Sequence, residues 1–188
     1  GIYDLLLTYF GDVPNKDGDG VVDYIFADLP PGIGGYFSPL DQSDQTGSNK
    51  RDILYIDILM NEEYSKSVIA HEAQHLIHSN YTNKGTKFNE GLSEMAIIVC
   101  GYGDVGVSFS RYLSNVGQIG WQWEQDGVHY DMGALFVLYF TEQLGDESLK
   151  VFQNINASGF NAFQQLLAYY NTSLTTESWF MNWFIANY

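Results

Sequence analysis

The sequence His71-Glu72-Ala73-Gln74-His75 has the pattern H-E-x-x-H, and we predict that it lies within a helix. Two side chains that are four residues apart lie about 40° apart around a helix, so both imidazoles can reach one metal ion. Glu72 would project beside that ion, where it can hold a water molecule and take its proton. The alternative is a polar helix face that carries two histidines by chance. The pattern favours a zinc site with a general base.

The segment around this motif predicts one long helix, from an N-cap at Asn61 to about Asn80. Two glutamates follow Asn61, where negative charge suits the positive end of the helix dipole. Neither Pro nor Gly interrupts the segment. Apolar residues recur with helical spacing away from the histidines, so one face packs and the other presents ligands to a cleft. These apolar residues are Ile69, Ala73 and Leu76.

The composition indicates a folded and strongly acidic protein. The 188 residues include 23 acidic and 8 basic side chains, for a net charge of −15, and 45% of them are hydrophobic. This length suits one domain, or two small lobes that share a cleft, and the hydrophobic content excludes a disordered chain. The negative charge argues against nucleic acid or an anionic membrane as a partner.

Several features bear on the compartment in which the protein works. No apolar run reaches transmembrane length and no signal peptide is present, and we interpret the start at Gly1 as that of a processed or trimmed chain. The single cysteine, Cys100, excludes a disulfide within the chain and is predicted to be a small buried side chain. Because acidity also suits a soluble extracellular protein, we expect a secreted monomer.

The first half of the chain predicts two strands. The first covers 21–29 and is ended by two prolines, and the second covers 53–59 and leads directly into the motif helix. A flexible glycine-rich loop is expected over 32–35, and a polar loop over 38–51. An edge strand beside a zinc helix can pair with an extended substrate, so the strand over 53–59 is a candidate for that role. Simple core packing is the equal alternative.

The rest of the chain is predominantly helical by pattern. A turn is expected over 82–87, and a loop over 114–128 carries Trp121 and Trp123, which either wall a cleft or pack. The second long helix is expected to start at an N-cap, Asn89, and to end near Cys100, where glycines follow. The other expected helices cover 2–9, 130–144, 160–170 and 176–187.

A segment near the start of the chain resembles the first part of a calcium-binding loop. Oxygen-bearing side chains alternate over 15–23 and a glycine follows them, but Phe26 stands where the complete pattern requires an acidic residue. The alternative is an Asp/Gly turn that leads into a strand. Both interpretations stay open for a structural calcium site. Its ligands would be Asn15, Asp17, Asp19 and Asp23, with the carbonyl of Val21.

A catalytic zinc ion takes three protein ligands and one water, so a third ligand is required. A third histidine six residues after His75 is excluded, because Tyr81 stands there. His78 lies a turn too far along the helix, and we expect it at the polar surface or behind the ligands. Glu90 and Glu94 are four residues apart on the second helix, so one can bind zinc while the other accepts a hydrogen bond from a ligand histidine.

A family resemblance chooses between these two glutamates. The segment Asn89-Glu90-Gly91-Leu92-Ser93-Glu94 resembles the N-E-G segment of the gluzincin peptidases, in which that glutamate is the third zinc ligand. The resemblance implies that Glu90 binds zinc from the first turn of its helix and that Glu94 supports a ligand histidine. Together with H-E-x-Q-H and the 14 residues between His75 and Glu90, it is similar to the hyicolysin family of bacterial metallopeptidases.

A second resemblance concerns the oxyanion that forms when a peptide bond is attacked. The segment Tyr130-Asp131-Met132-Gly133-Ala134 resembles the Y-x-x-G helix start of aminopeptidase-type gluzincins, in which the tyrosine hydroxyl stabilises the oxyanion. This resemblance implies that Tyr130 is the donor. His129 is the alternative donor, and a tyrosine that is simply buried in the core is the other interpretation.

These observations predict an α+β protein with a zincin-like fold. A small N-terminal mixed sheet and the active-site helix would form the lobe 1–80, and a mainly helical lobe would cover 81–188. The two lobes would share one cleft and make a single metallopeptidase catalytic domain. The resemblance implies a zinc endopeptidase that acts on proteins or peptides, with calcium as a possible structural ion.

Two other functions remain open at this point. A gluzincin-type aminopeptidase would bind the free amine of its substrate through a G-x-M-E-N segment, and only a poor match stands at Met60-Asn61-Glu62. A catalytically inactive, calcium-stabilised binding module on a zincin fold is the other alternative. Glu72 is intact, which argues against the inactive module, because a decayed site usually loses its base.

Overall fold

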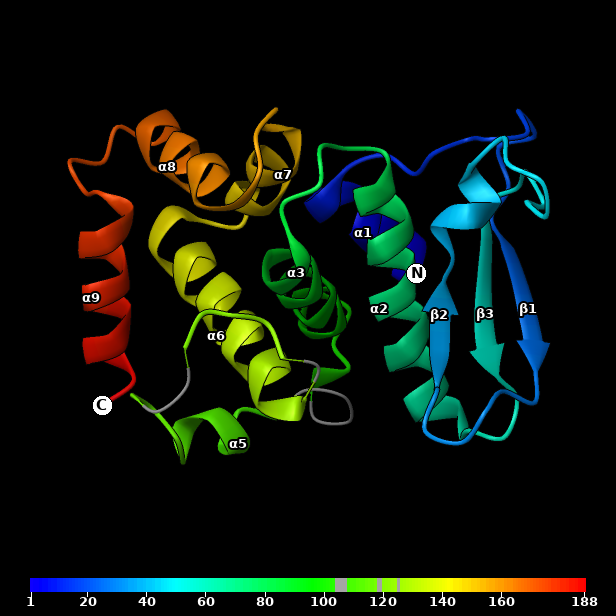
Figure 1. The fold of residues 1–188 in the computed structure, drawn as a ribbon, viewed down its shortest axis with the longest axis horizontal. Coiled ribbons are helices and arrows are strands. Elements are labelled where there is room, and N and C mark those ends of the chain that lie inside the picture. Colours follow the sequence, from blue (N-terminus) through cyan, green and yellow to red (C-terminus); the bar gives the residue numbers. More distant parts are fainter. Residues whose placement is uncertain (104–107, 118–119, 125) are drawn as a thin grey trace.

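A small sheet and a layered set of helices lie side by side in the computed structural model (Figure 1), which describes residues 1–103, 108–117, 120–124 and 126–188. Helix α2, Glu62–Ser79, lies next to the sheet and contacts two of its strands. Helices α3, Thr86–Val99, and α6, Gly127–Leu144, follow as further layers away from the sheet. This mixed architecture, with strands first and helices after, confirms the predicted class and is compatible with a zincin-like fold.

The sheet has three strands in the order β1-β3-β2. Strand β1, Asp23–Ala27, runs parallel to β3, Ile53–Asp57, and β2, Gly35–Phe37, runs antiparallel to β3. The sheet is therefore mixed, as predicted. The central position of β3 shows that its proposed role as a substrate-pairing edge strand is wrong, because both of its edges are already paired.

Strand β2 lies beside α2 at one edge of the sheet, and its first residue, Gly35, had been expected to end a flexible loop over 32–35. A Cβ atom at Gly35 would lie 2.6 Å from a methyl group of Val68 and 2.8 Å from the carbonyl oxygen of Tyr55. The glycine is therefore needed for close approach between β2, the sheet and α2, and not for flexibility. A three-residue strand is too short for an alternating pattern to show, so its partner defines it.

Helix α2 agrees with its prediction at both ends. The side chain of Asn61 accepts a hydrogen bond from the Tyr64 amide at 2.9 Å, which caps the first turn. Ala73 and Leu76 are buried as predicted, whereas Ile69 is only half-buried and Ala70 and Ile77 complete the buried face. Its members are Ala70, Ala73, Leu76 and Ile77.

The N-cap of α3 lies four residues before its predicted position, and α6 starts three residues before its own. The N-cap of α3 is Gly85, with φ of +88°, so Asn89 is not the cap and Glu90 lies in the second turn instead of the first. The N-cap of α6 is Asp126, whose side chain accepts from the His129 amide at 3.0 Å. Thr86 and Lys87, which belonged to the turn predicted over 82–87, lie in the first turn of α3, and Lys87 is buried.

The remaining helices complete a mainly helical second half. The short helices α5, Ser110–Leu113, and α7, Glu147–Asn154, were not predicted, and neither was a 3-10 turn over Pro39–Gln42. Each has eight residues or fewer, which is shorter than the window over which a helical period is assessed. The expected helices are α1, Ile2–Phe10, α8, Gly159–Tyr169, and α9, Thr176–Ala186.

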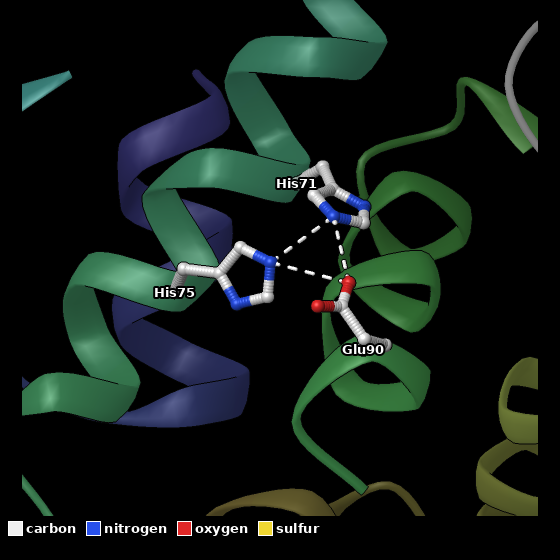
Figure 2. Close-up of side chains that lie close together, drawn as sticks. All are labelled: His71, His75 and Glu90. Carbon is white, nitrogen blue, oxygen red and sulfur yellow. Dashed lines mark hydrogen bonds and ion pairs between the residues drawn. The ribbon is translucent and has the colours of Figure 1, made fainter. Parts of the chain in front are cut away.

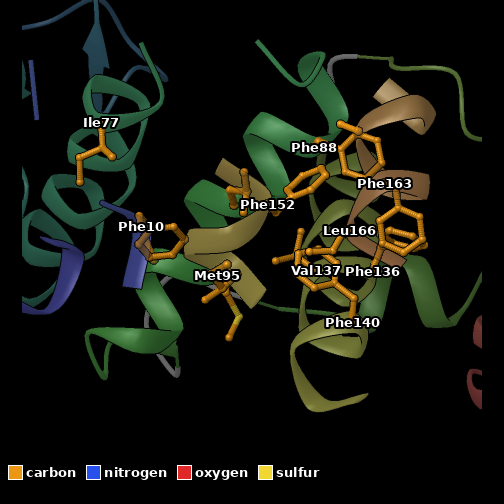
Figure 3. Packing of buried hydrophobic residues seen from close by; sticks show 14 of the residues in the cluster. Phe10, Ile77, Phe88, Met95, Phe136, Val137, Phe140, Phe152, Phe163 and Leu166 are labelled. Carbon is orange, nitrogen blue, oxygen red and sulfur yellow. The ribbon is translucent and has the colours of Figure 1, made fainter. Parts of the chain in front are cut away.

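An aromatic core holds α3, α6, α8 and α9 together (Figure 3). Phe136 of α6 is fully buried, and its ring centroid lies 5.0 Å from that of Phe163 and 4.6 Å from that of Phe180. Trp121 joins this cluster at 4.9 Å from Phe136, so it packs in the core. Positions 118, 119 and 125 of the predicted loop lie outside the described residues. None of the helices in the described ranges is long and apolar enough to cross a membrane.

Candidate metal centre

Three side chains from two helices converge on one point (Figure 2). His71 and His75 come from successive turns of α2, and Glu90 comes from α3. The two Nε2 atoms lie 3.1 Å apart, and Oε2 of Glu90 lies 3.3 Å from Nε2 of His71 and 3.4 Å from Nε2 of His75. The three atoms therefore form a nearly equilateral triangle.

The size of this triangle fits a single zinc ion. Zinc binds imidazole nitrogen and carboxylate oxygen at about 2.0–2.2 Å, so neighbouring ligand atoms of a tetrahedral site are about 3.3 Å apart. Oε2 of Glu90 is buried, and the Nε2 atoms of His71 and His75 are its polar neighbours among the described residues. A buried carboxylate oxygen between two imidazole nitrogens is a position that a cation would stabilise.

The electrostatics of the centre also suit a cation. Burial would raise the pKa of Glu90, but hydrogen bonds with both histidines outweigh it and hold that pKa at about 2. Burial would likewise lower the pKa of His71, yet the carboxylates of Glu90 and Glu94 raise it to about 10. In the metal-free chain a proton on His71 therefore offsets the carboxylates, and a metal ion would replace that proton.

An oxygen atom lies beside the Nδ1 atom of each of the two histidines. Oε1 of Glu94 lies 3.2 Å from Nδ1 of His71, and Oγ of Ser93 lies 3.0 Å from Nδ1 of His75. Ser93 also donates to Oε1 of Gln74 at 2.6 Å, so its oxygen is free to accept from the imidazole. These contacts leave both Nε2 atoms to face the centre.

Sequence reasoning had identified Glu94 but not Ser93 or Gln74. A signal for Ser93 was present, because it lies three residues after Glu90 and therefore shares a helix face with it. Gln74 is completely buried although it is polar. No periodic pattern predicts that, since its partner comes from another helix.

The side chain of Glu72 extends from α2 to β2. Its Oε2 accepts a hydrogen bond from the Phe37 amide at 3.0 Å, and only 8% of the residue is exposed. The edge strand thus fixes the carboxylate beside the metal centre. Sequence reasoning could not foresee this contact, because β2 itself was missed.

Two pockets flank the centre, one on either side. The pocket on the side of His71 has a volume of about 160 Å³, and that on the side of His75 about 420 Å³. The first is lined by residues of β2, α2 and α3 and includes Glu72. The second includes Phe37, Tyr81 and Glu90. The three ligands therefore lie along a cleft that continues in both directions.

Tyr130 is the aromatic side chain beside the ligands. Its ring centroid lies 6.3 Å from that of His71 and 5.0 Å from that of Trp123. Burial, together with the charges of three nearby glutamates, raises the pKa of Tyr130 to about 12, so the hydroxyl keeps its proton. Trp123 packs against the ring of Tyr130. The glutamates are Glu90, Glu94 and Glu72.

His129 is engaged elsewhere. The residue is 4% exposed, and its Nδ1 lies 2.7 Å from Oδ1 of Asp126, the cap of α6. With Glu124 and Asp126 it forms a second group of possible metal ligands among the described residues. The capping bond accounts for that grouping without an ion.

His78 lies neither at the surface nor at the metal centre, so the expectation of a polar surface position is wrong. The residue is 4% exposed, its Nδ1 lies 2.7 Å from Oε1 of Gln153, and its Nε2 accepts from the Lys84 amide at 3.2 Å. Burial lowers the pKa of His78 to about 4, so the ring is neutral. It ties α2 to α7 and to the loop before α3.

The aspartates of the predicted calcium loop surround the guanidinium group of Arg51. Its nitrogens lie 2.8 Å from Asp17, 3.0 Å from Asp19 and 3.1 Å from Asp23. A hydrogen bond from Arg51 is the main cause that lowers the pKa of Asp17. A positive charge thus stands among the three acidic side chains that were predicted to bind calcium.

Two of the predicted calcium ligands also accept hydrogen bonds that form a turn. Oδ1 of Asn15 accepts from the Gly20 amide at 3.0 Å, and Oδ1 of Asp19 accepts from the Val21 amide at 2.8 Å. These bonds are typical of an Asp/Gly turn. Calcium binding by this loop stays a prediction, with Arg51 as an internal competitor.

Comparison with known proteins supports a proteolytic role. No protein-family model matches the chain. The chain is similar to the neutral metalloprotease ShpI of Staphylococcus hyicus, with 32% identity over an alignment that covers 40% of this chain. The alignment spans 21% of that relative, about a fifth of its length. Together with the cluster of His71, His75 and Glu90, this similarity supports metal-dependent proteolysis.

The calcium loop yields a first prediction. Because Arg51 and calcium would compete for the same carboxylates, we expect Arg51→Gln to bind calcium more tightly than the wild type. Calcium should then raise the melting temperature of Arg51→Gln by more than that of the wild type, and Asp19→Ala should remove both increases. An equal calcium effect in wild type and Arg51→Gln would show that Arg51 does not compete.

The metal-free centre yields a prediction about pH. The pKa of His71 is raised from 6.5 to about 10, so its stabilising contribution is complete below pH 6.5 and is lost as the pH rises through 10. The pKa of Glu90 is lowered from 4.5 to about 2, so its contribution is present above pH 4.5 and is lost toward pH 2. The pair should therefore stabilise the chelator-treated protein most between pH 4.5 and 6.5.

Urea unfolding in the presence of chelator at pH 6, 8 and 10 would measure this effect. His71→Gln lacks the titrating ring and serves as the control. The wild type should lose more stability than this variant as the pH rises. Parallel stability curves for the two proteins would contradict the assigned pKa of His71.

Proposed function

We propose that this protein is a zinc-dependent endopeptidase of the gluzincin type, similar to the hyicolysin family, in which His71, His75 and Glu90 bind the ion. The observation that carries the proposal is the triangle of ligand atoms, with sides of 3.1, 3.3 and 3.4 Å. Its sides match the ligand spacing of a tetrahedral zinc site that keeps one position open. The similarity to a neutral metalloprotease supports the same class of reaction.

Glu72 is the general base of the proposed reaction. A zinc ion in this site supplies a Lewis acid that makes water a nucleophile near neutral pH. Glu72 takes the proton from the attacking water and passes it to the leaving amine. Its carboxylate is held by the Phe37 amide on one side and borders the pocket beside His71 on the other. Glu94 and Ser93 orient the ligand imidazoles.

Tyr130 is the proposed donor to the oxyanion. The carbonyl oxygen of the substrate gains negative charge during attack, and a protonated hydroxyl opposite the zinc ligands can stabilise it. Tyr130 stays protonated because its pKa is about 12, and its ring lies beside His71. His129 is the weaker candidate because Asp126 engages its Nδ1.

The shape of the cleft favours cleavage within a peptide chain. Pockets continue on both sides of the ligands, so substrate residues can bind on either side of the bond that is cut. Strand β2 replaces β3 as the strand along which an extended substrate would lie. In the segment that was a poor match to the amine-binding pattern, Asn61 caps α2 and Glu62 pairs with Lys66 at 2.7 Å.

The alternatives make different experimental predictions. An aminopeptidase would cleave peptides with a free amino terminus and spare blocked ones, whereas an endopeptidase would cleave both. An inactive binding module would cleave neither when loaded with zinc. Secretion, a monomeric state and the division into two lobes remain predictions, of which the net charge of −15 supports only the first.

The first test concerns the base. Glu72→Gln keeps the size of the side chain but cannot take a proton, so we expect kcat to fall by about a hundredfold or more. Zinc content should stay near one ion per chain by elemental analysis, since Glu72 is not one of the three ligands. Glu63→Gln, an exposed glutamate on the same helix, is the matched control. Equal cleavage by Glu72→Gln and the wild type would remove Glu72 from the reaction.

The second test separates the two glutamates of α3. Glu90→Ala removes an atom of the triangle and should abolish zinc binding. Glu94→Ala leaves the triangle in place but frees the imidazole of His71, so zinc affinity should fall by about tenfold to a hundredfold. Competition with a chromophoric chelator measures both affinities. If Glu94→Ala loses zinc and Glu90→Ala retains it, the assignment of the two residues is reversed.

A further inference from the structure

Helices α3 and α6 touch backbone to backbone at two glycines. A Cβ atom at Gly91 would lie 2.5 Å from the carbonyl oxygen of Gly133 and 3.0 Å from a methyl group of Val137. A Cβ atom at Gly133 would lie 3.0 Å from the carbonyl oxygen of Lys87 and 3.3 Å from Cα of Gly91. A side chain at Gly91 requires the backbones to shift apart, and one at Gly133 requires its neighbours to give by a few tenths of an ångström.

Conformational freedom does not explain these glycines. Both lie inside helices, and neither has the positive φ that favours glycine elsewhere in this chain. A glycine inside a helix costs roughly 0.5–1 kcal/mol relative to alanine. Two of them that face one another therefore indicate a requirement for close approach at this crossing.

The crossing lies next to the two residues that would act on opposite sides of the substrate carbonyl. Gly91 directly follows Glu90 on α3, and Gly133 lies three residues after Tyr130 on α6, on the same face of the helix. The distance between the helix axes at the glycines therefore sets the distance between Tyr130 and the ligands. Nothing larger than hydrogen separates the two backbones there.

Other contacts fix the surroundings of Tyr130, so the contact between Gly91 and Gly133 is the one at which the separation of α3 and α6 can change. Trp123 packs against Tyr130 from the loop before α6, and Nζ of Lys87 binds the carbonyl oxygens of Gly120 and Gln122 in that loop, each at 3.3 Å. The loop is thus tied to α3, close to the crossing. If the helices separated, Tyr130 would move away from the metal centre while its neighbours stayed anchored.

We propose that Gly91 and Gly133 are positioning residues that hold Tyr130 at catalytic distance from the zinc ligands. The inference rests on the proposed peptidase function. It adds a reason for the glycine in the motif that contains Glu90 and for the glycine in the motif that starts at Tyr130. Neither glycine would touch the substrate. Their role is to fix the separation of α3 and α6.

The test compares Gly91→Ala and Gly133→Ala with the wild type, each alone and combined with Tyr130→Phe. Since a misplacement of about 1 Å can cost about a hundredfold in rate, we expect Gly91→Ala to lower kcat by roughly tenfold to a hundredfold. Gly133→Ala should cost less, because its closest contact is 3.0 Å and not 2.5 Å. KM, and zinc affinity by chelator competition, should change by less than about threefold in either variant, since the ligands stay in place.

The double variants give the decisive measurement. When Tyr130→Phe has already removed the hydroxyl, Gly91→Ala should cost less than about twofold further, because residues that act as a unit are not additive. Gly103→Ala is the matched control, since its nearest contact would be an ordinary 3.7 Å to Ile98. If Gly91→Ala fails to fold, as thermal unfolding would show, the milder Gly133→Ala carries the same cycle.

The outcomes separate this inference from the proposed function. A zinc-loaded wild type that cleaves no peptide overturns the proposed function, and this inference with it. An active wild type whose glycine variants keep full kcat overturns the inference alone. The same holds if Tyr130→Phe is fully active, or if the glycine variants lose as much kcat in the Tyr130→Phe background as in the wild type.

Discussion

The burial of Glu90 is the constraint on which the site depends. A carboxylate away from water is stable only when opposite charge or hydrogen bonds compensate it, and here the compensation comes from two imidazoles of α2. This pairing fixes the faces that α2 and α3 turn toward one another. Glu94 and Ser93 lie one turn along α3 from Glu90 and meet the far nitrogens of the same rings. The metal centre is therefore also a contact between helices.

The basic residues of the chain do not compensate the charge of Glu90. The chain has 8 Lys and Arg residues against 23 acids, and each of the 8 has a partner other than Glu90 within the described residues. Arg51 neutralises three aspartates of the N-terminal loop, and Arg111 binds Asp131 at the start of α6. Lys84 and Lys87 are buried on backbone carbonyls. No Lys or Arg side chain therefore balances the carboxylates of the centre, and a metal ion would supply that positive charge.

The sequence predicted those features that a local pattern encodes. Helix α2, its cap at Asn61 and the common face of His71 and His75 follow from spacing within 20 residues, and the structure has all three. Strand β2 and the start of α3 were missed because partners distant in sequence decide them. Gly35 fits only against Val68, and Lys87 is buried only because carbonyls of another loop receive its charge. Arg51 lies about thirty residues along the chain from the aspartates with which it pairs. The local sequence therefore resembled a calcium-binding loop without showing this ion pair.

The same limit applies to the two resembling motifs. The sequence shows a glycine after Glu90 and another three residues after Tyr130, and each alone is consistent with its own family pattern. Only the structure shows that these glycines meet, which makes the two motifs parts of one helix crossing. Glu72 depends in turn on β2, through the Phe37 amide. The residues proposed as base, ligands and oxyanion donor therefore lie on helices that are positioned by two separate close approaches. Packing of α3 against α6, and of β2 against α2, is thus part of the chemistry of the site as well as of its stability.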